Sequence, residues 1–329
     1  MILGCDVGGT KCNLALFEPR GARLEAGFTQ RYPSQQFDRF EKIIAQFLED
    51  ARAEFGTAPL KLEAAGLGVA GPVVENRVRA TNLPWIVDAA ALAKQLGTPH
   101  IVLLNDLEAS GYSLELLRPE ELATLNVGEA APRAAKVLIA AGTGLGEAVL
   151  YWDGARYFVA GSEGGHADLA PRTEEEIELL RYLKKSQEFV GFEAILSGRG
   201  FFAIHKFLAP EMKHASFDQP GVDPAPEITE RGLAGTCPVC VHTLDLWTAL
   251  YGAEAGNLAL KAVSRNGVYV AGGIAVKILP KLKDGTFFRA FCQKEKLGEM
   301  LARIPIHVVL NEKAPLLGAA TQAARSVGE

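Results

Sequence analysis

Residues 6–17 read DVGGTKCNLALF, and residues 140–151 read AAGTGLGEAVLY. When the two segments are aligned, Gly8 pairs with Gly142. In both segments an apolar strand is followed by a Gly/Thr turn, and the turn is followed by a strand of alternating apolar and polar residues. Glycine permits positive φ and a close backbone approach, so successive N–H groups can converge on an anion. A single copy would favour an ordinary hairpin turn. The repeat favours two phosphate-binding turns, one in each half of the chain.

Composition limits the classes of protein that remain. The chain has 329 residues, of which 48% are hydrophobic and 22% charged, which suits a globular protein of two domains. A net charge of −5 argues against nucleic-acid binding, and Gly or a charge interrupts every long apolar stretch, which argues against a membrane span. The opening MILGCDV has no basic leader and the five cysteines are an odd number, so we expect a cytoplasmic protein with free thiols.

Strand and helix patterns alternate along the chain, which predicts an α/β fold with helices covering sheets. The expected strands are 2–7, 13–17, 64–70, 100–104, 268–271 and 305–310. The expected helices are 37–55, 88–96, 173–187, 192–197, 237–264 and 314–324. Because the last helix follows the second half, we expect the chain to return and pack on the first domain.

Two dinucleotide-like glycine patterns do not fit a Rossmann site. Gly66 to Gly71 matches G-x-G-x-x-G by letter, but Pro72 and an extended segment follow where that fingerprint needs a helix. The second candidate, which begins at Gly142, has Glu147 in place of its third glycine. No G-x-x-x-x-G-K-[ST] motif is present, which excludes a P-loop.

Asn105 and Asp106 directly follow the buried strand expected at 100–104. Ligands of open α/β sheets bind at the carboxyl ends of the strands, so a catalytic carboxylate is expected here. The alternative is that Asp106 caps the helix that begins near Leu107. Both interpretations stay open at this point, and they do not exclude each other.

A second polar group lies at Ser162–His166, which reads SEGGH, and at Glu193 in FEAILSG. Carboxylates, an amide and a neutral imidazole can pair with sugar hydroxyls, which donate and accept together. Taken alone, His166 would be an ordinary loop histidine, and Glu193 a favourable charge in the first turn of a helix.

Cys237 and Cys240 form a lone C-x-x-C. Zinc would need a second pair or histidines at matching spacing, and redox chemistry would need a thioredoxin-like setting. His242 is too close to the pair to serve, so we interpret the pair as structural and as the start of a long helix.

Six motifs in order resemble the bacterial glucokinase family of the hexokinase/actin-like superfamily. They are DVGGTK, LLND, AAGTGLG, EGGH, FEAILSG and VAGGI, together with ATNLPW at 80–85 and the terminal PLLGAA. The resemblance implies a two-domain actin-like ATPase (ribonuclease H-like) fold, with small and large α/β domains around a cleft. The implied small domain is 1–116 with the C-terminal segment from about 307 to 329, and the large domain is 117–306.

The resemblance also implies an ATP-dependent glucokinase that uses Mg²⁺ and phosphorylates the 6-hydroxyl of glucose. Asp106 would be the general base, with Asn105, Glu163, His166 and Glu193 as the partners of the remaining hydroxyls. The implied phosphate-binding residues are Gly8, Gly9, Thr10, Gly142, Thr143 and Gly144. Asp6 would orient Mg²⁺, either directly or through water, while Gly272 and Gly273 would approach the adenosine. A homodimer would not be surprising.

Departures from the family pattern define the alternatives. Lys11 stands where many glucokinases have Asn, and GGTK is shared with the repressor–kinase (ROK) sugar kinases. The ROK family carries a cysteine-rich zinc motif soon after its Gly-His, whereas ADLAPRTEEE follows His166, so the ROK family is the poorer match.

Two alternative functions remain, a kinase for another hexose and a non-catalytic regulator that binds sugar and ATP. A regulator would not need Asp106 together with the residues that pair with the hydroxyls. ATP, ADP or polyphosphate could each be the donor.

Overall fold

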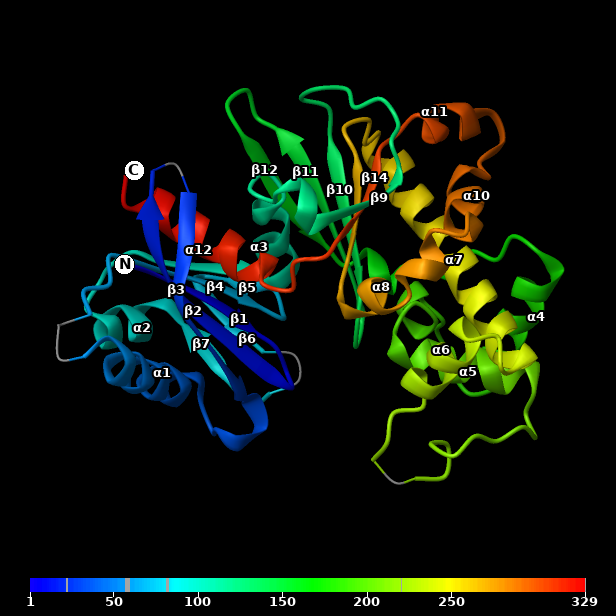
Figure 1. Cartoon of the computed structure of the whole chain (residues 1–329), viewed down its shortest axis with the longest axis horizontal. Helices are drawn as coiled ribbons and strands as arrows, with labels where there is room; N and C mark the ends of the chain where they lie inside the picture. Colours follow the sequence, from blue (N-terminus) through cyan, green and yellow to red (C-terminus); the bar gives the residue numbers. More distant parts are fainter. Residues whose placement is uncertain (22, 57–59, 81–82, 220, 329) are drawn as a thin grey trace. The chain divides into compact units, whose positions relative to one another are not determined.

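The computed structural model describes residues 1–21, 23–56, 60–80, 83–219 and 221–328 (Figure 1). Within them, strands and helices alternate along much of the chain, which confirms the predicted α/β class. No helix among these residues combines the length and the apolar character needed to cross a membrane.

The chain divides into two compact units. Unit 1 consists of Met1–Arg118, Tyr157–Gly161 and the segment from Asn311 onward, and unit 2 consists of Pro119–Arg156 and Ser162–Leu310. Nothing in the sequence indicated that the segment Tyr157–Gly161 groups with unit 1. The domain boundaries implied by the resemblance stay a prediction.

A five-stranded sheet with the order β3-β2-β1-β4-β8 forms the centre of unit 1. Its strands are β1 (Ile2–Val7), β2 (Lys11–Arg20), β3 (Arg23–Pro33), β4 (Ala64–Val69) and β8 (Ile101–Asn105). β1, β4 and β8 are parallel, and their register aligns Val7 with Val69 and Val69 with Asn105. The carboxyl ends of these three strands therefore lie at one edge of the sheet.

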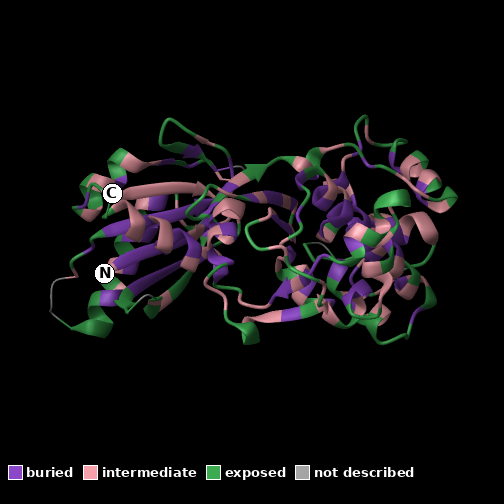
Figure 2. Ribbon diagram, turned by 90° about the horizontal axis from the view of Figure 1, so that it is seen from above, coloured by how far each residue is buried: buried purple, intermediate pink, exposed green. Residues whose placement is uncertain are grey.

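Helices pack on both faces of this sheet. They are α1 (Phe40–Phe55), α2 (Ala89–Leu96), α3 (Asp106–Ser113) and α12 (Ala314–Ser326), with a 3-10 turn at Ser34–Gln36. Alternate residues of β1 point to opposite faces: Leu3, Cys5 and Val7 join the core that contains α1, whereas Ile2 packs with α12. β1 and β4 are almost wholly buried, in line with the purple strands beside the N-terminus in Figure 2. The expected return of the last helix to the first half of the chain is confirmed.

α12 approaches the sheet closely because glycine lies beneath it. A Cβ on Gly66 of β4 would lie 1.9 Å from the carbonyl oxygen of Ala319, and a Cβ on Gly4 would lie 2.6 Å from that of Leu316. Glycine at these strand positions removes the side chain that would hold the helix away.

A small second sheet completes unit 1. It consists of β5 (Val73–Val74), β6 (Arg77–Arg79) and β7 (Ile86–Asp88). Trp85 is buried and its ring centroid lies 6.3 Å from that of Phe40 in α1, so this sheet shares the core of the larger one. Thr81 and Asn82 of the ATNLPW motif lie outside the described residues.

A six-stranded sheet with the order β12-β11-β10-β13-β14-β9 is formed by strands between residues 122 and 309, all in unit 2 except most of β12. Its strands are β9 (Leu122–Asn126), β10 (Lys136–Ala141), β11 (Leu145–Trp152), β12 (Tyr157–Ser162), β13 (Val268–Ala271) and β14 (Ile306–Val309). β10, β13 and β14 are parallel. The pairing of Ala140 with Ala271 brings the turns that follow β10 and β13 to the same edge.

Helices make up most of the rest of unit 2. They are α4 (Glu174–Leu183), α5 (Gly198–Leu208), α6 (Ala225–Leu233), α7 (Pro238–Ala262), α8 (Gly273–Lys277), α9 (Leu279–Leu282), α10 (Thr286–Cys292) and α11 (Gly298–Ala302), with 3-10 turns at Pro119–Glu121, Gly164–His166, Phe192–Ala194 and Glu295–Leu297. α7 is buried on nearly all sides, as its apolar composition requires. Its Trp247 stacks on Phe201 of α5 at 4.6 Å and lies 4.9 Å from Tyr251.

The helix predicted at 192–197 is wrong. Only a 3-10 turn forms at Phe192–Ala194, Ser197 is extended, and a regular helix, α5, begins at Gly198. The N–H of Gly198 donates to the carbonyl of Gly142 at 2.9 Å, so the backbone leaves the helical path there. Two glycines in the first turn of α5 weaken its helix signal, which explains why the sequence pattern missed it.

Candidate functional site

The first set of candidate residues lies at the edge of the unit 1 sheet where β1, β4 and β8 end. The turn Gly8-Gly9-Thr10 follows β1, and Asn105 and Asp106 follow β8. β4 lies between these two strands, and a Cβ on its Gly68 would lie 3.5 Å from the Cα of Asp106. The fold therefore places a glycine turn and a carboxylate at the same end of the three parallel strands of a mixed sheet.

A buried serine holds the first glycine turn. The N–H of Gly8 donates to the carbonyl of Lys11 at 3.1 Å, which closes the turn. Ser34 Oγ donates to the carbonyl of Gly8 at 2.7 Å, and the N–H of Ser34 donates to that of Thr10 at 3.0 Å. Sequence reasoning missed Ser34, because no spacing links it to a turn so far upstream.

Asn105 is the N-cap of α3, and Asp106 is the first helical residue. Asn105 Oδ1 accepts from the N–H of Leu107 at 2.9 Å, and the N–H of Asn105 donates to Glu108 Oε2 at 3.0 Å, which completes a capping box. Asp106 Oδ1 also lies 2.9 Å from the N–H of Leu107. Asn105, rather than Asp106, is therefore the main N-cap of α3. The Asp106 side chain is half-buried.

Asp6 sits near the end of β1 in a short polar chain. Asn13 Nδ2 donates to Asp6 Oδ2 at 2.9 Å, and Arg31 Nε donates to Asn13 Oδ1 at 2.8 Å. Burial raises the pKa of Asp6 above its ordinary value, against the lowering effects of Asn13, Lys11 and Arg31. A cation nearby would favour the ionised form, so this carboxylate is chemically suited to a hydrated Mg²⁺.

The second set of candidate residues lies in unit 2, where β10 and β13 end side by side. Gly142 to Gly144 follow β10, and Gly272 and Gly273 follow β13. Gly272 has φ +89°, and a Cβ there would lie 2.3 Å from the carbonyl oxygen of Ala141. Only glycine fits at this contact between the two turns.

The second glycine turn is also closed by the N–H of its first glycine. The N–H of Gly142 donates to the carbonyl of Gly144 at 2.8 Å, one residue earlier than the bond from Gly8 to Lys11 in the first turn. The carbonyl of Gly142 in turn accepts from Gly198, the first residue of α5. The N-terminus of α5, with the exposed Arg199 in its first turn, therefore lies against this glycine turn.

Glu193 contacts the same turn from the 3-10 segment Phe192–Ala194. Its Oε2 accepts from the N–H of Leu145 at 3.1 Å and would lie 2.4 Å from a Cβ on Gly144. Arg199 Nη2 lies 3.5 Å from Glu193 Oε1. Sequence reasoning found Glu193 but neither Arg199 nor these contacts, because α5 was not predicted.

Glu163 and His166 flank a Gly pair at the end of β12. Their side chains are 75% and 66% exposed, and His166 Nε2 lies 3.9 Å from Glu163 Oε2. Gly165 packs against Leu145, since a Cβ there would lie 2.1 Å from its carbonyl oxygen. The N–H of Phe192 donates to the carbonyl of Ala167 at 3.0 Å, so the loop that carries His166 lies beside the segment that carries Glu193.

Two buried carboxyl groups lie behind this loop. Glu147 of β11 and Glu254 of α7 are 1% and 0% exposed, and a Cβ on Gly164 would lie 2.0 Å from Glu147 Oε2. Burial, followed by the charge of Glu254, raises the pKa of Glu147 to about 8. Lys261 Nζ lies 3.8 Å from Glu254 Oε1. Neither residue was predicted, because burial of a carboxyl group leaves no sequence pattern.

Of the histidines, only His242 was weighed from the sequence as a partner of the C-x-x-C pair, whereas the structure places two other histidines there. His205 and His214 both lie at Cys237 and Cys240, and one ligand atom from each of the four residues falls within 4.8 Å of the others. Both histidines precede the cysteines, with a spacing unlike that of common zinc motifs, so the sequence pattern missed them.

Comparisons with known proteins show the family of the chain. The glucokinase family model matches residues 3–326 of the chain. The chain belongs to the glucokinase family. It is 40% identical to a glucokinase of Nostoc sp. (strain PCC 7120), with 99% of each chain covered, and 38% identical to one of Synechocystis sp. (strain PCC 6803), with 98% of each covered. ATP-dependent glucokinase activity is accordingly the function of this chain, as the motifs predicted.

Solved structures confirm the predicted two-domain sugar-kinase fold. A glucokinase from an Antarctic psychrotroph superposes with a TM-score of 0.83 at 28% identity, with 98% of each chain covered. A ROK family glucokinase from Streptomyces griseus, whose structure contains glucose and AMPPNP, superposes with a TM-score of 0.67 at 21% identity, with 98% of this chain and 99% of that chain covered. The fold is thus shared by glucokinases and ROK sugar kinases, and the family match selects the glucokinases.

Proposed function

We propose that this chain transfers the γ-phosphoryl group of ATP to the 6-hydroxyl of glucose, with Asp106 as the general base. The observation that carries the proposal is the repeated placement of a glycine turn and polar side chains at the carboxyl ends of parallel strands. In unit 1 these are the Gly8 turn and Asp106, and in unit 2 the Gly142 turn and Glu193.

The two turns would bind the phosphates through their later residues. Gly8 and Gly142 each use their own N–H to close their turn. In the described part of the chain, no backbone carbonyl accepts from the N–H groups of Gly9, Thr10, Thr143 or Gly144. These N–H groups would meet the anion, and in unit 2 the N-terminus of α5 and Arg199 would add positive charge.

Asp106 would accept the proton of the 6-hydroxyl as the oxygen attacks phosphorus and the bond to ADP breaks. Phosphoryl transfer depends chiefly on positioning and charge stabilisation, so one base with backbone amides suffices for the protein's part. Mg²⁺, when bound, neutralises charge on the phosphates, and Asp6 would hold it through water. The capping box of Asn105 fixes the start of α3, and with it the position of Asp106.

Asn105, Glu163, His166 and Glu193 would pair with the other sugar hydroxyls. Asn105 uses Oδ1 for its cap, and its Nδ2 lies 3.4 Å from the carbonyl of Gly71. Glu163 and His166 expose most of their side chains, which suits groups that contact a ligand. Gly272 and Gly273 would let the adenosine approach the backbone.

The proposal is tested by an ADP-release assay with ATP, Mg²⁺ and a panel of hexoses. Glucose is expected to give the highest kcat/KM, with mannose, fructose and amino sugars well below it. Replacing ATP by ADP or polyphosphate is expected to lower turnover strongly. ATP binding without turnover of any sugar would contradict the proposal and favour a sugar-responsive regulator.

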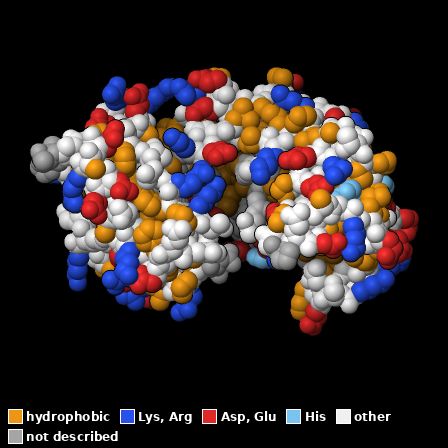
Figure 3. All heavy atoms as spheres, turned by 60° about the horizontal axis from the view of Figure 1, so that its bottom comes forward, with side chains coloured by type: hydrophobic (Ala, Val, Ile, Leu, Met, Phe, Trp, Pro, Cys, Tyr) orange, Lys and Arg blue, Asp and Glu red, His pale blue; other side chains and the backbone are white. Residues whose placement is uncertain are grey.

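We propose a cytoplasmic location because all five cysteines, Cys5, Cys12, Cys237, Cys240 and Cys292, are free thiols. Both charge signs are scattered over the face shown in Figure 3, in line with small-molecule substrates. A homodimer stays a prediction, and light scattering after size-exclusion chromatography would test it.

A further inference from the structure

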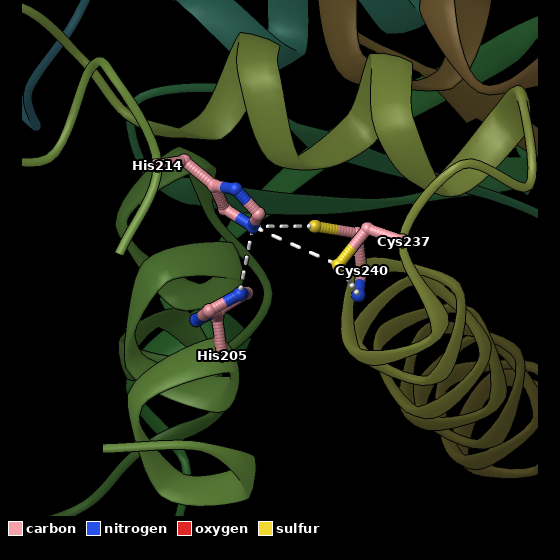
Figure 4. A group of neighbouring side chains, drawn as sticks. All are labelled: His205, His214, Cys237 and Cys240. Carbon is pink, nitrogen blue, oxygen red and sulfur yellow. Dashed lines mark hydrogen bonds between the residues drawn. The ribbon is translucent and has the colours of Figure 1, made fainter. Parts of the chain in front are cut away.

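Four side chains from three segments of unit 2 converge, and none of them is among the residues assigned to the kinase reaction. His205 lies in the last turn of α5, His214 in the segment that links α5 to α6, and Cys237 and Cys240 at the start of α7 (Figure 4). His205, Cys237 and Cys240 are buried and His214 is half-buried. Cys237 is the N-cap of α7, so the C-x-x-C spacing turns both sulfur atoms toward the same side.

Three distances between these groups are close to those between the ligands of one tetrahedral ion, and all four ligand atoms lie within 4.8 Å of one another. His205 Nε2 and His214 Nε2 lie 3.2 Å apart, and His214 Nε2 lies 3.2 Å from Cys240 Sγ and 3.7 Å from Cys237 Sγ. With Zn–S near 2.3 Å and Zn–N near 2.0–2.1 Å, ligand atoms around tetrahedral zinc are separated by about 3.3 to 3.8 Å.

Hydrogen bonding alone does not account for this cluster. His214 Nε2 makes three contacts in Figure 4, yet a ring nitrogen offers either one hydrogen or one lone pair. At most one of these contacts can then be a full hydrogen bond. The other ring nitrogen of His205, Nδ1, is buried without a hydrogen-bond partner among the described residues. Only an interaction at Nε2 can therefore compensate for the cost of removing this ring from water. A cation between the four atoms would satisfy all of them.

We propose that His205, His214, Cys237 and Cys240 bind one structural Zn²⁺ ion. Two thiolates and two neutral imidazoles balance the charge of the ion, which limits the cost of burying it. On binding, each thiol releases its proton to solvent and its sulfur becomes a ligand. Two sulfur and two nitrogen ligands in a tetrahedron select zinc among the common divalent metals. All four positions are filled by the protein, as in structural rather than catalytic zinc sites.

The environment of the cluster suits a structural ion. The Phe217 ring lies edge-on to both imidazoles, with centroids 5.0 Å from His205 and 5.1 Å from His214. Met212 Sδ lies 3.9 Å from Cys237 Sγ. Residues 209 to 224 form no regular helix or strand in their described part, and the ion would tie this long segment to the ends of α5 and α7.

The test measures zinc in the full-length protein, purified under reducing conditions without chelator and dialysed against metal-free buffer. The wild type is expected to hold one zinc ion per chain. Loss of a residue that only supports a metal ligand lowers metal affinity by about 10- to 100-fold. Because His214→Ala and Cys240→Ser each remove a ligand itself, they are expected to lower zinc affinity by more than this. His214 is half-buried in a loop, so its variant is the one expected to fold.

Two control variants distinguish loss of this zinc site from nonspecific loss of zinc. His242→Ala changes a histidine of the same α7 that instead lies 2.8 Å from Glu175, and Cys292→Ser removes a free cysteine of α10. Both variants are expected to retain one zinc ion. Equal loss of zinc in His242→Ala and His214→Ala would overturn the proposal.

Two further readouts do not depend on the variants. Cobalt added to the zinc-free wild type is expected to give the visible d–d bands of a tetrahedral ion and a thiolate charge-transfer band. A strong chelator is expected to lower the melting temperature of the wild type but not that of His214→Ala. Reduced wild-type protein that binds neither zinc nor cobalt would overturn the site, as would a Cys237–Cys240 disulfide in protein isolated anaerobically. Because none of these readouts uses glucose or ATP, they stand apart from the kinase proposal.

Discussion

Asp106 occupies the first position of α3, directly after the half-buried strand β8. We predict that Asp106→Asn lowers kcat by at least about 10²-fold while glucose binding changes little, because the amide keeps the shape of the side chain but cannot accept the proton. Steady-state kinetics and glucose titration by calorimetry measure the two effects separately.

The matched control is Asp88→Asn at the start of α2. Asp88 is the N-cap of that helix, accepts from Ala90 and Ala91, and lies in the same unit. Asparagine is as good an N-cap as aspartate, so this variant is expected to keep both stability and kcat. Near-normal turnover of Asp106→Asn would remove Asp106 from the role of base.

The buried pair Glu147 and Glu254 leads to a prediction about pH. The pKa of Glu147 is raised to about 8 by burial and by Glu254, so the folded state holds a proton that the unfolded state releases near pH 4.5. Stability should therefore fall as the pH rises from about 4.5 to 8. Glu147→Gln is expected to flatten this part of the profile and to raise the melting temperature at neutral pH. Parallel melting profiles of the two proteins between pH 5 and about 8 would contradict this account.

Residues in local patterns could be predicted from the sequence, whereas residues that meet only in the fold could not. The apolar run at 100–104 predicted a strand, so the place of Asn105 and Asp106 at a strand end could be inferred, although β8 is half-buried rather than buried. Ser34 reaches the Gly8 turn from a distant segment, and Glu147 meets Glu254 across two elements. Contacts of this kind depend on tertiary packing, which leaves no local spacing.

At the scale of elements, the contact between α12 and the sheet gives a third prediction. Gly66→Ala would place a methyl group 1.9 Å from the carbonyl of Ala319, which forces the helix away from β4. We expect a loss of about 1–3 kcal/mol in the free energy of unfolding, the usual cost of overpacking. This free energy is measured by urea denaturation, with unfolding monitored by circular dichroism.

Gly27→Ala in β3 serves as the comparison. Its Cβ would lie 3.7 Å from the Phe55 ring, an ordinary contact, so the variant is expected to be neutral or slightly stabilising. Equal destabilisation by both substitutions would show that loss of glycine itself, rather than the approach of α12, is responsible.

Elements with strong periodicity were predicted well, and those with glycine or unusual spacing were not. β1 was predicted with its full bounds and α7 to within two residues at its C-terminal end, since both have uninterrupted patterns. α5 was missed because glycines begin it. The same omission concealed His205, and with it the cluster at Cys237, because a helix that is not predicted cannot be assigned a ligand.

At the scale of the whole molecule, unit 1 is built from the N-terminal and the C-terminal segments of the chain. α12 covers one face of the sheet that β1 and β4 form, and its Leu316, Ala320 and Ala323 bury apolar residues of those strands. We predict that a chain ending at Leu310 keeps unit 2 folded but loses amide protection throughout Met1–Arg118, as measured by hydrogen exchange with mass spectrometry. A chain that lacks only the residues after Ser326 is the control and should exchange like the full chain. Full protection of β1 and β4 in the shorter chain would show that α12 is dispensable.

The late position of α12 affects how the protein is made. A ribosome releases the strands of unit 1 early, but the helix that closes their second face leaves the exit tunnel only after the whole of unit 2 has been translated. The nascent chain therefore carries an uncovered apolar sheet face for most of its synthesis, a state in which chaperones bind and aggregation begins. In a cell, unit 2 should mature first, and sugar phosphorylation should begin only when translation has delivered the last helix.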